Sequence, residues 1–276
     1  MESNQIDKIS LVVSDVDGTL IDGNKMLTDK TKAAVQKLRD AGISFTVTSA
    51  RPPFGLRVIA ETLDLQYPMG SFNGGVISYR NGETLECTSL DSKMIPEIIT
   101  MAENYDLDAW LYSDCHWYVK NLDGFHVDHH KETLQFEPTV INSYEDVRDE
   151  IFKIIAVGSD FDAVFQCETA IQQKFGNSLA ATRSQPYNLD ITPPQANKGE
   201  AVKQIARHLN IPTNEIVTIG DSFNDISMFE CSGTSIAMGN ADAEVQKKAA
   251  HVTASNKEEG FAKAIDRFIL GRGIDS

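Results

Sequence analysis

The sequence predicts an α/β fold, with a doubly wound parallel-sheet core and a second, α+β domain inserted into it. Buried strands that end in polar residues recur near both ends of the chain, and helices with one apolar face connect them. A stretch of mixed strands and helices interrupts this pattern in the middle. The 276 residues, 41% hydrophobic and 24% charged, are enough for one large or two modest globular domains.

The first strand lies in Ile9–Asp22, whose sequence is ISLVVSDVDGTLID. Its apolar run ends in Asp15 and Asp17, followed by Gly18 and Thr19. Residues two apart in an extended backbone point to the same side, so both carboxylates should lie at the carboxyl end of the strand, where open α/β sheets bind ligands. Two such carboxylates repel unless a cation or a shared proton lies between them, which indicates a metal site, a proton shuttle or both. A simple turn is the alternative, because Asp and Gly are common in turns.

A helix and a second strand follow. Leu27–Ala41 carries apolar residues on one helical face, Thr28 is its expected N-cap, and Gly42 is its expected end. Ile43–Thr48 is then a second buried strand. A strand, a helix and a strand joined by short loops form a βαβ unit, which predicts parallel strands.

The same pattern returns late in the chain. We expect a helix at Lys198–Leu209, strands at Ile216–Gly220, Thr234–Met238 and His251–Thr253, and a helix at Ala241–Ala250. The two ends of the chain therefore build one Rossmann-like core.

The middle of the chain differs. Its expected elements are a hairpin of Ala109–Leu111 and Trp117–Lys120, helices at Ser143–Ile151 and Glu168–Phe175, and a strand at Lys153–Gly158. We therefore predict a core domain of residues 1–83 and 190–276 and a cap domain of residues 84–189.

Charge, apolar patterning and cysteine spacing exclude several classes of function. The net charge of −15 argues against a nucleic-acid or anionic-membrane partner, both of which require a basic surface. We see no apolar run near 18 residues and no secretory signal pattern. The four cysteines are far apart in the sequence and form no CxxC pair, which favours reduced thiols and a cytoplasmic protein: Cys87, Cys115, Cys167 and Cys231.

Two further segments can hold an anion. Ser49 follows the second strand, where its hydroxyl and the neighbouring backbone of Ala50 could bind a phosphate, with Arg51 as a supporting partner; an N-cap or a turn is the commoner use of such a serine. Lys198 opens a helix, where the macrodipole disfavours a cation. This position suggests a compensating phosphate or carboxylate, although a solvated lysine is the simpler interpretation.

The segment GDSFND, Gly220–Asp225, indicates a metal site. A buried strand leads to Asp221, and Asn224 and Asp225 follow within one turn. Oxygen ligands of this kind suit Mg²⁺, and Ser222 could reach its water shell. An N-cap would explain Asp221 alone, but not the whole cluster.

DVDGTL, Ser49, Lys198 and GDSFND occur in the order of the four motifs of the haloacid dehalogenase superfamily, which the chain resembles. It is most similar to the Cof-type phosphatases, which carry a large cap between the second and third motifs. SFNGG, NKGEAV, AMGNADAEV and SNKEEG resemble recurring segments of that subfamily. The chain departs from it at Thr48–Arg51, TSAR in place of the usual TGR, where Ala50 replaces a glycine.

The resemblance implies a role for each motif residue. Asp15 would be the nucleophile, and Asp17 the general acid and then the general base. Mg²⁺ would be held by the Asp15 carboxylate, the Asp17 carbonyl and Asp221, with Ser222 nearby, while Asp225 would orient Lys198 or a metal-bound water.

The same resemblance implies a phosphate site. Lys198, Ser49 and Asn224 would hold the oxygens of the transferred group, together with backbone N–H groups near Val16 and Ala50.

We therefore expect a Mg²⁺-dependent phosphomonoester hydrolase acting on small phosphorylated metabolites: sugar phosphates first, pyridoxal or flavin phosphates second. Its partner would be the substrate, with neither nucleic acid nor membrane, in a monomer or homodimer. The alternatives are a phosphomannomutase-like enzyme, a sucrose- or trehalose-phosphate phosphatase-like enzyme, and a catalytically silent sensor of a phosphorylated metabolite.

Two groups of cap residues allow more than one interpretation. The spacing of His126, His129 and His130 would permit a metal site on a helix, but a solvated or substrate-facing surface is favoured. For the aromatic and His residues a buried core is favoured over a sugar-stacking surface: Trp110, Tyr112, His116, Trp117 and Tyr118.

Overall fold

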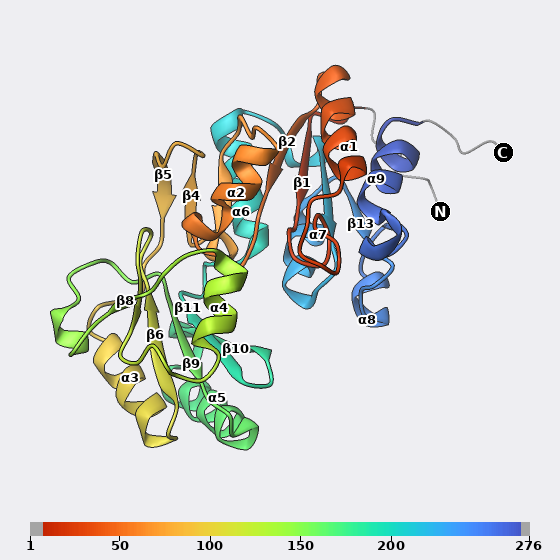
Figure 1. The fold of residues 1–276 in the computed structure, drawn as a ribbon. Helices are drawn as coiled ribbons and strands as arrows, with labels where there is room; N and C mark the ends of the chain where they lie inside the picture. Colours follow the sequence, from red (N-terminus) through yellow and green to blue (C-terminus); the bar gives the residue numbers. More distant parts are fainter. Residues whose placement is uncertain (1–7, 272–276) are drawn as a thin grey trace. The chain divides into compact units, whose positions relative to one another are not determined.

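The computed structural model describes residues 8–271, which form two compact units (Figure 1). The core unit runs to Ala50, resumes over Arg57–Glu86 and continues from Asn197, whereas the inserted unit comprises Arg51–Leu56 and Cys87–Ala196. The assignment of a core domain to 1–83 and 190–276 and of a cap domain to 84–189 stays a prediction.

A five-stranded parallel sheet lies at the centre of the described part of the core unit, in the order β14-β13-β12-β1-β2. Its strands are β1 (Leu11–Ser14), β2 (Ser44–Val47), β12 (Ile216–Gly220), β13 (Thr234–Ala237) and β14 (His251–Val252). The early and late βαβ patterns thus enter one sheet, and the predicted α/β fold is confirmed. A smaller sheet is formed by β3 (Met69–Ser71), β4 (Val76–Ser78) and β5 (Thr84–Cys87).

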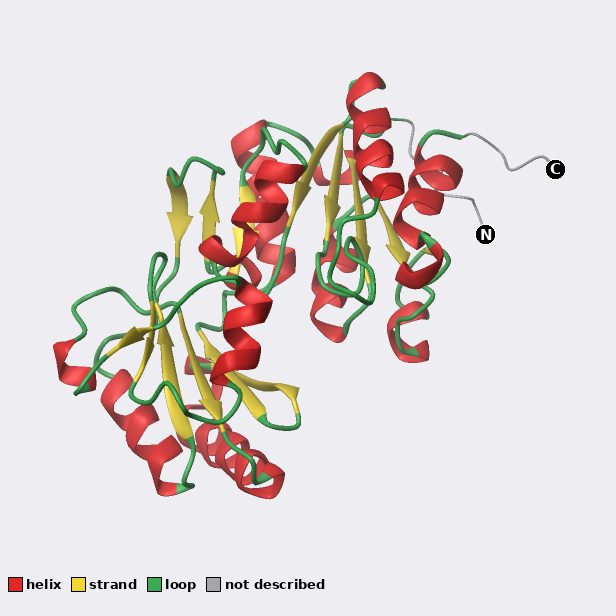
Figure 2. Cartoon of the chain, viewed as in Figure 1, coloured by secondary structure: helices red, strands yellow, loops and turns green. Residues whose placement is uncertain are grey.

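Helices cover both faces of the parallel sheet, which makes it doubly wound (Figure 2). On one face Phe45 of β2 packs edge-on against Phe261, with ring centroids 5.7 Å apart. On the other face the apolar side chains of the helix that begins at Lys198 pack against Leu11 and Val13 of β1. The helices are α1 (Asp29–Asp40), α6 (Lys198–Leu209), α7 (Ile226–Cys231), α8 (Ala243–Gln246) and α9 (Gly260–Ala264), with α2 (Pro53–Thr62) beginning in the inserted unit.

The predicted ends of α1 are confirmed. The Thr28 hydroxyl accepts a hydrogen bond from the backbone N–H of Thr31, and Gly42 takes a left-handed conformation after the helix. The helix predicted over Ala241–Ala250 is shorter than expected, because only Ala243–Gln246 is α-helical. The N–H of Ala250 donates instead to the Ser235 side chain, at 3.1 Å.

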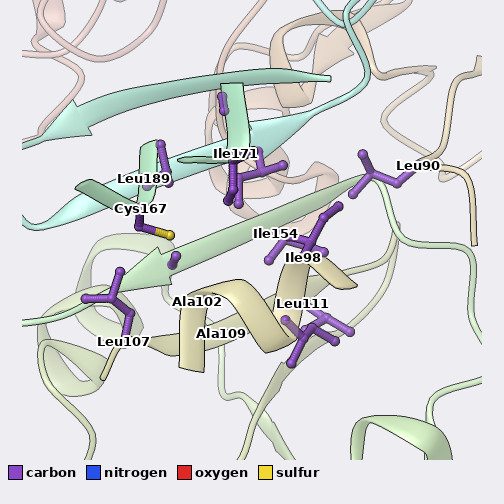
Figure 3. Packing of buried hydrophobic residues seen from close by; sticks show 14 of the residues in the cluster. Leu90, Ile98, Ala102, Leu107, Ala109, Leu111, Ile154, Cys167, Ile171 and Leu189 are labelled. Carbon is purple, nitrogen blue, oxygen red and sulfur yellow. The ribbon is translucent and has the colours of Figure 1, made fainter. Parts of the chain in front are cut away.

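The inserted unit contains a six-stranded sheet in the order β10-β11-β9-β6-β7-β8. Alternating side chains of its central strands, such as Leu111, Ile154 and Leu189, point to one face and pack against two helices there (Figure 3). The elements are α3 (Ile95–Asn104), β6 (Asp108–Tyr112), β7 (Trp117–Val119), α4 (Val127–Leu134), β8 (Thr139–Val140), β9 (Lys153–Val157), α5 (Phe161–Phe175), β10 (Ala180–Gln185) and β11 (Asn188–Thr192). In the described residues, single 3-10 turns lie at Phe72–Gly74, Tyr144–Asp146, Gly176–Ser178, Thr213–Glu215, Phe223–Asp225 and Asn256–Glu258, and a π-helical turn at Ile265–Ile269 continues from α9.

The opposite face of this sheet carries Trp110, Tyr112 and Trp117, whereas Tyr118 belongs to the cluster on the helix-covered face. Trp110 and Trp117 are buried and contact His130 of α4, with ring centroids 5.2 and 5.0 Å apart. His130 therefore packs in an aromatic core, and His126 precedes α4 in a left-handed conformation. The preference for a core is confirmed for the Trp and Tyr residues, whereas His116 is only half-buried.

The helix predicted over Ser143–Ile151 is wrong. The chain makes one short turn at Tyr144–Asp146 and then extends. Arg148 Nη1 donates to the carbonyl oxygens of Glu145 and Val147, and the Asp149 side chain accepts hydrogen bonds from outside the segment. These side-chain contacts replace the backbone hydrogen bonds of a helix.

Within residues 8–271 no helix combines the length and the apolar character that a membrane crossing requires. All four cysteines are free thiols.

The turn after β1 depends on a glycine. Gly18 has φ +86°, and a Cβ atom at this position would lie 2.3 Å from Asp221 Oδ2. Gly82 has a similar φ of +89°, but a Cβ atom there would meet nothing within 4 Å. The two glycines therefore share the backbone requirement and differ only in the space around them.

We predict that Gly82→Ala lowers the free energy of unfolding by about 1–2 kcal/mol, the cost of a left-handed alanine. Gly18→Ala should lower the free energy of unfolding by about 1–3 kcal/mol more than Gly82→Ala does, because the methyl group also displaces Asp221. Urea unfolding followed by circular dichroism measures both. An equal loss of unfolding free energy in the two variants would show that a Cβ atom at position 18 does not clash with Asp221.

Candidate active site

The parallel sheet brings two acidic strand ends together. β1 and β12 are neighbours with Ser14 opposite Ile219, so the residues that follow them, Asp15 and Asp221, emerge at the same edge. The Asp15 N–H donates to the Ile219 carbonyl at 2.8 Å, which extends the pairing beyond the strand. This is the edge at which α/β sheets bind ligands.

Lys198 links the residue that follows β1 to the loop that follows β12. It is the first residue of α6, whose N-cap is the Asn197 side chain. Its side chain is 2% exposed, and Nζ donates to Asp15 Oδ1 and to Asp225 Oδ1, both at 2.5 Å. The two carboxylates supply the negative charge that a lysine at a helix N-terminus needs.

Asp225 organises the loop after β12. While its Oδ1 accepts from Lys198, its Oδ2 accepts from the backbone N–H groups of Asp221 and Ser222, both at 2.8 Å. Gly220 permits this contact, because a Cβ there would lie 2.4 Å from the Asp225 carboxyl carbon. With three hydrogen bonds accepted, Asp225 is suited to positioning Lys198 and the loop.

Asp221 is held by two polar side chains that the motif pattern did not assign. Thr19 Oγ1 donates to Asp221 Oδ1 at 3.0 Å, and Asn240 Nδ2 donates to Asp221 Oδ2 at 3.2 Å. Asn240 Nδ2 also donates to the Gly18 carbonyl at 3.0 Å. Both residues lie in segments that resemble the family, Thr19 in DVDGTL and Asn240 in AMGNADAEV, so these segments could have indicated them.

The electrostatics of this group favour a cation. Carboxylate oxygens of Asp15, Asp221 and Asp225 lie within 4.8 Å of one another, around the single ammonium of Lys198. Burial raises the pKa of Asp15 and of Asp221, and the neighbouring carboxylate of Asp225 adds to both effects, while Lys198 opposes them. Burial alone would lower the pKa of Lys198, but Asp15 and Asp225 raise it, so the ammonium stays charged. The donor set therefore fits a hard divalent cation such as Mg²⁺.

Asp17 does not join this carboxylate group. The expectation that it lies beside Asp15 used the alternation of an extended strand, but β1 ends at Ser14 and the chain turns at once. Asp17 is exposed, and Val16 between the two aspartates is fully buried. Asp225, far along the sequence, contributes the carboxylate beside Asp15 instead.

The predicted phosphate ligands Ser49 and Asn224 are joined by Asn73. The Asn73 N–H donates to the Ser49 carbonyl at 2.8 Å, and Asn73 Oδ1 accepts from Asn224 Nδ2 at 3.2 Å. Asn73 has φ +57° and lies in the SFNGG segment. Ser49 is buried, and its own N–H donates to the Gly70 carbonyl at 2.9 Å.

Other predicted residues have different surroundings. Ser222 is exposed and Ala50 is half-buried in the core unit. Arg51 belongs to the inserted unit, where its Nη1 donates to the Gly55 carbonyl at 3.2 Å. The contacts above therefore bring together Asp15, Lys198, Asp221 and Asp225, and separately connect Ser49 with Asn224.

Comparisons with known proteins identify the family. The haloacid dehalogenase-like hydrolase family matches residues 12–265. The Bacillus subtilis protein YwtE, a 5-amino-6-(5-phospho-D-ribitylamino)uracil phosphatase, is 29% identical over 286 aligned positions that cover 95% of this chain and 98% of the relative.

Two solved structures have the same fold. A haloacid dehalogenase-like hydrolase from Bacteroides thetaiotaomicron superimposes with a TM-score of 0.88 at 26% identity, covering 95% of this chain and all of the other, 100%. The sugar phosphatase BT4131, of haloacid dehalogenase subclass IIB, superimposes with a TM-score of 0.82 at 21% identity, covering 94% and 98% of the two chains.

The family match extends over almost the whole chain and includes the four motif positions and the strands of the parallel sheet, apart from Leu11 at the start of β1. The chain therefore belongs to the haloacid dehalogenase-like hydrolases, and within them it is a phosphatase of the Cof type.

Proposed function

We propose that the protein hydrolyses phosphomonoesters of small metabolites in a Mg²⁺-dependent reaction that passes through an aspartyl-phosphate on Asp15. One observation carries the proposal: the buried Lys198 ammonium bridges Asp15 and Asp225 at the carboxyl edge of the sheet. This contact fixes one Asp15 oxygen, and it puts positive charge beside the place where an anionic phosphoryl group must approach.

In the first step the Asp15 carboxylate forms a bond to phosphorus while the bond from phosphorus to the substrate alcohol breaks. Asp17 gives a proton to the departing oxygen. In the second step Asp17 takes a proton from a water molecule, which attacks phosphorus and releases inorganic phosphate and free Asp15. Lys198, Ser49 and Asn224 hold the oxygens of the transferred group, with N–H groups near Val16 and Ala50.

Mg²⁺ is the cofactor in this proposal. The carboxylates of Asp15 and Asp221 and the Asp17 carbonyl would hold it, with Ser222 near its water shell. Bound there, it reduces the repulsion between an anionic nucleophile and an anionic phosphate. Thr19 and Asn240 support this role because they fix both oxygens of Asp221.

For the substrate we propose a phosphorylated sugar or sugar alcohol. The relative YwtE is named for a compound that carries a phosphorylated ribityl chain. Residues 84–189 would act as the cap that selects the alcohol part, and the enzyme would work in the cytoplasm as a monomer or homodimer. Pyridoxal and flavin phosphates are further candidates. A mutase-like reaction or a silent sensor would retain binding without net release of phosphate.

The first test is the release of inorganic phosphate from a panel of sugar, ribityl, pyridoxal and flavin phosphates. We expect turnover with Mg²⁺, its loss on chelation, and its recovery when Mg²⁺ is restored. Asp15→Asn should lower turnover by at least about a thousandfold, because the nucleophile is lost. Asp29→Asn, which changes a fully exposed carboxylate on α1, is the control and should leave turnover unchanged. Substrate binding without turnover by the wild-type protein would favour the sensor.

A second test separates the buried lysine from an exposed one on the same helix. Lys198→Met should lower kcat by about 10²–10³-fold, the typical effect of removing one donor to the transferred oxygens. Lys203→Met, which removes a half-exposed ammonium paired with Glu200, should leave kcat unchanged. Similar losses in both variants would indicate damage to α6 and would contradict a specific role for Lys198.

A further inference from the structure

A second cluster of chemically reactive side chains lies in the inserted unit, at the turn between β6 and β7. The Ser113 hydroxyl, which belongs to a fully buried residue, accepts hydrogen bonds from the backbone N–H groups of Cys115 and His116 at 3.3 and 2.9 Å. The Ser113 N–H donates to the His116 carbonyl at 2.9 Å, which closes the turn. The thiol and the imidazole are thereby presented from a fixed backbone.

Three potential ligand atoms converge at this turn. Cys115 Sγ lies 3.3 Å from His116 Nδ1, and His116 Nδ1 lies 2.7 Å from Asp149 Oδ2. All three ligand atoms lie within 4.8 Å of one another. Cys115 and Asp149 are exposed and His116 is half-buried, so a solvent ion can reach them.

The carboxylate of this cluster is held in place by a further side chain. The Tyr118 hydroxyl donates to Asp149 Oδ2 at 2.6 Å. This hydrogen bond and the one from His116 lower the pKa of Asp149, so the group is ionised and oriented toward the imidazole. A ligand supported by an outer hydrogen bond is the usual arrangement at protein metal sites.

The chemistry of the three side chains selects a class of metal. A thiolate, an imidazole and a carboxylate suit borderline ions such as Zn²⁺ and Co²⁺, whereas Mg²⁺ prefers oxygen ligands alone. Around a tetrahedral ion, bonds of about 2.3 Å to sulfur and about 2.0–2.2 Å to nitrogen and oxygen put sulfur and nitrogen about 3.5–3.6 Å apart, and nitrogen and oxygen about 3.3–3.5 Å apart. The observed distances are 3.3 Å between sulfur and nitrogen and 2.7 Å between nitrogen and oxygen, so binding requires the first pair to separate by about 0.2–0.3 Å and the second, once its shared proton leaves, by about 0.6–0.8 Å.

We propose that Cys115, His116 and Asp149 form a binding site for a borderline divalent metal ion, Zn²⁺ or Co²⁺, with solvent in the remaining position. On binding, the Cys115 thiol releases its proton to solvent, and the imidazole proton moves from Nδ1 to Nε2 so that Nδ1 can ligate. The site is independent of the phosphatase proposal, because none of its residues belongs to the Asp15 group.

Cobalt titration tests the site directly. Co²⁺ is added to the full chain in excess Mg²⁺, and thiolate-to-cobalt charge-transfer absorption is recorded. The Asp15 site contains no thiol, so this band reports the new site alone. We expect saturation at one Co²⁺ per chain and loss of the band when Zn²⁺ is added. Asp149→Asn should weaken binding by about tenfold or more.

A matched pair of thiol variants decides the assignment. Cys115→Ser should abolish the band, whereas Cys87→Ser, which removes another exposed thiol, should retain it. Unchanged Mg²⁺-dependent turnover and an unchanged circular dichroism spectrum would show that Cys115→Ser is folded. No band in the wild-type protein, a band that survives Cys115→Ser, or a band lost equally in both thiol variants would overturn the proposal.

Discussion

The arrangement of the core unit depends on one buried contact, the Lys198 ammonium between Asp15 and Asp225. These residues are 183 and 27 positions apart from Lys198 in the sequence and come from three different elements. A buried charge is tolerated only with a close partner of opposite sign, and removing one partner of such a group typically costs about 3–5 kcal/mol. The contact therefore fixes β1, α6 and the loop after β12 in one arrangement, and the carboxyl edge of the sheet is built around it.

The three carboxylates near this contact differ in their hydrogen-bond partners. Both oxygens of Asp225 already accept hydrogen bonds, one from Lys198 and the other from two backbone N–H groups. Asp221 is held by Thr19 and Asn240, whereas Asp15 shares only one oxygen with Lys198. The side chains held in this way need little rearrangement when an anion binds. Charges that are already in position lower an activation barrier most effectively.

The sequence predicted what depends on local pattern, including the βαβ units and the Thr28 cap. It failed where tertiary contacts decide. The helix over Ser143–Ile151 is replaced by side-chain hydrogen bonds, and β1 ends at Ser14, before the two aspartates whose alternation was assumed. The motif segments contained Asn73 and Asn240 but did not indicate their partners, which are remote in sequence: Asn224 for the first, Gly18 and Asp221 for the second.

The central claim is that Asp15 becomes covalently phosphorylated, and trapping that species tests it most directly. The wild-type protein is mixed with its best phosphorylated substrate and Mg²⁺, quenched in acid within the first turnover, and digested for peptide mapping by mass spectrometry. The account predicts one phosphate on the peptide that contains Asp15, and none in Asp15→Asn. Phosphate release at full rate with no phosphopeptide at any quench time, or a phosphate on another residue, would contradict it.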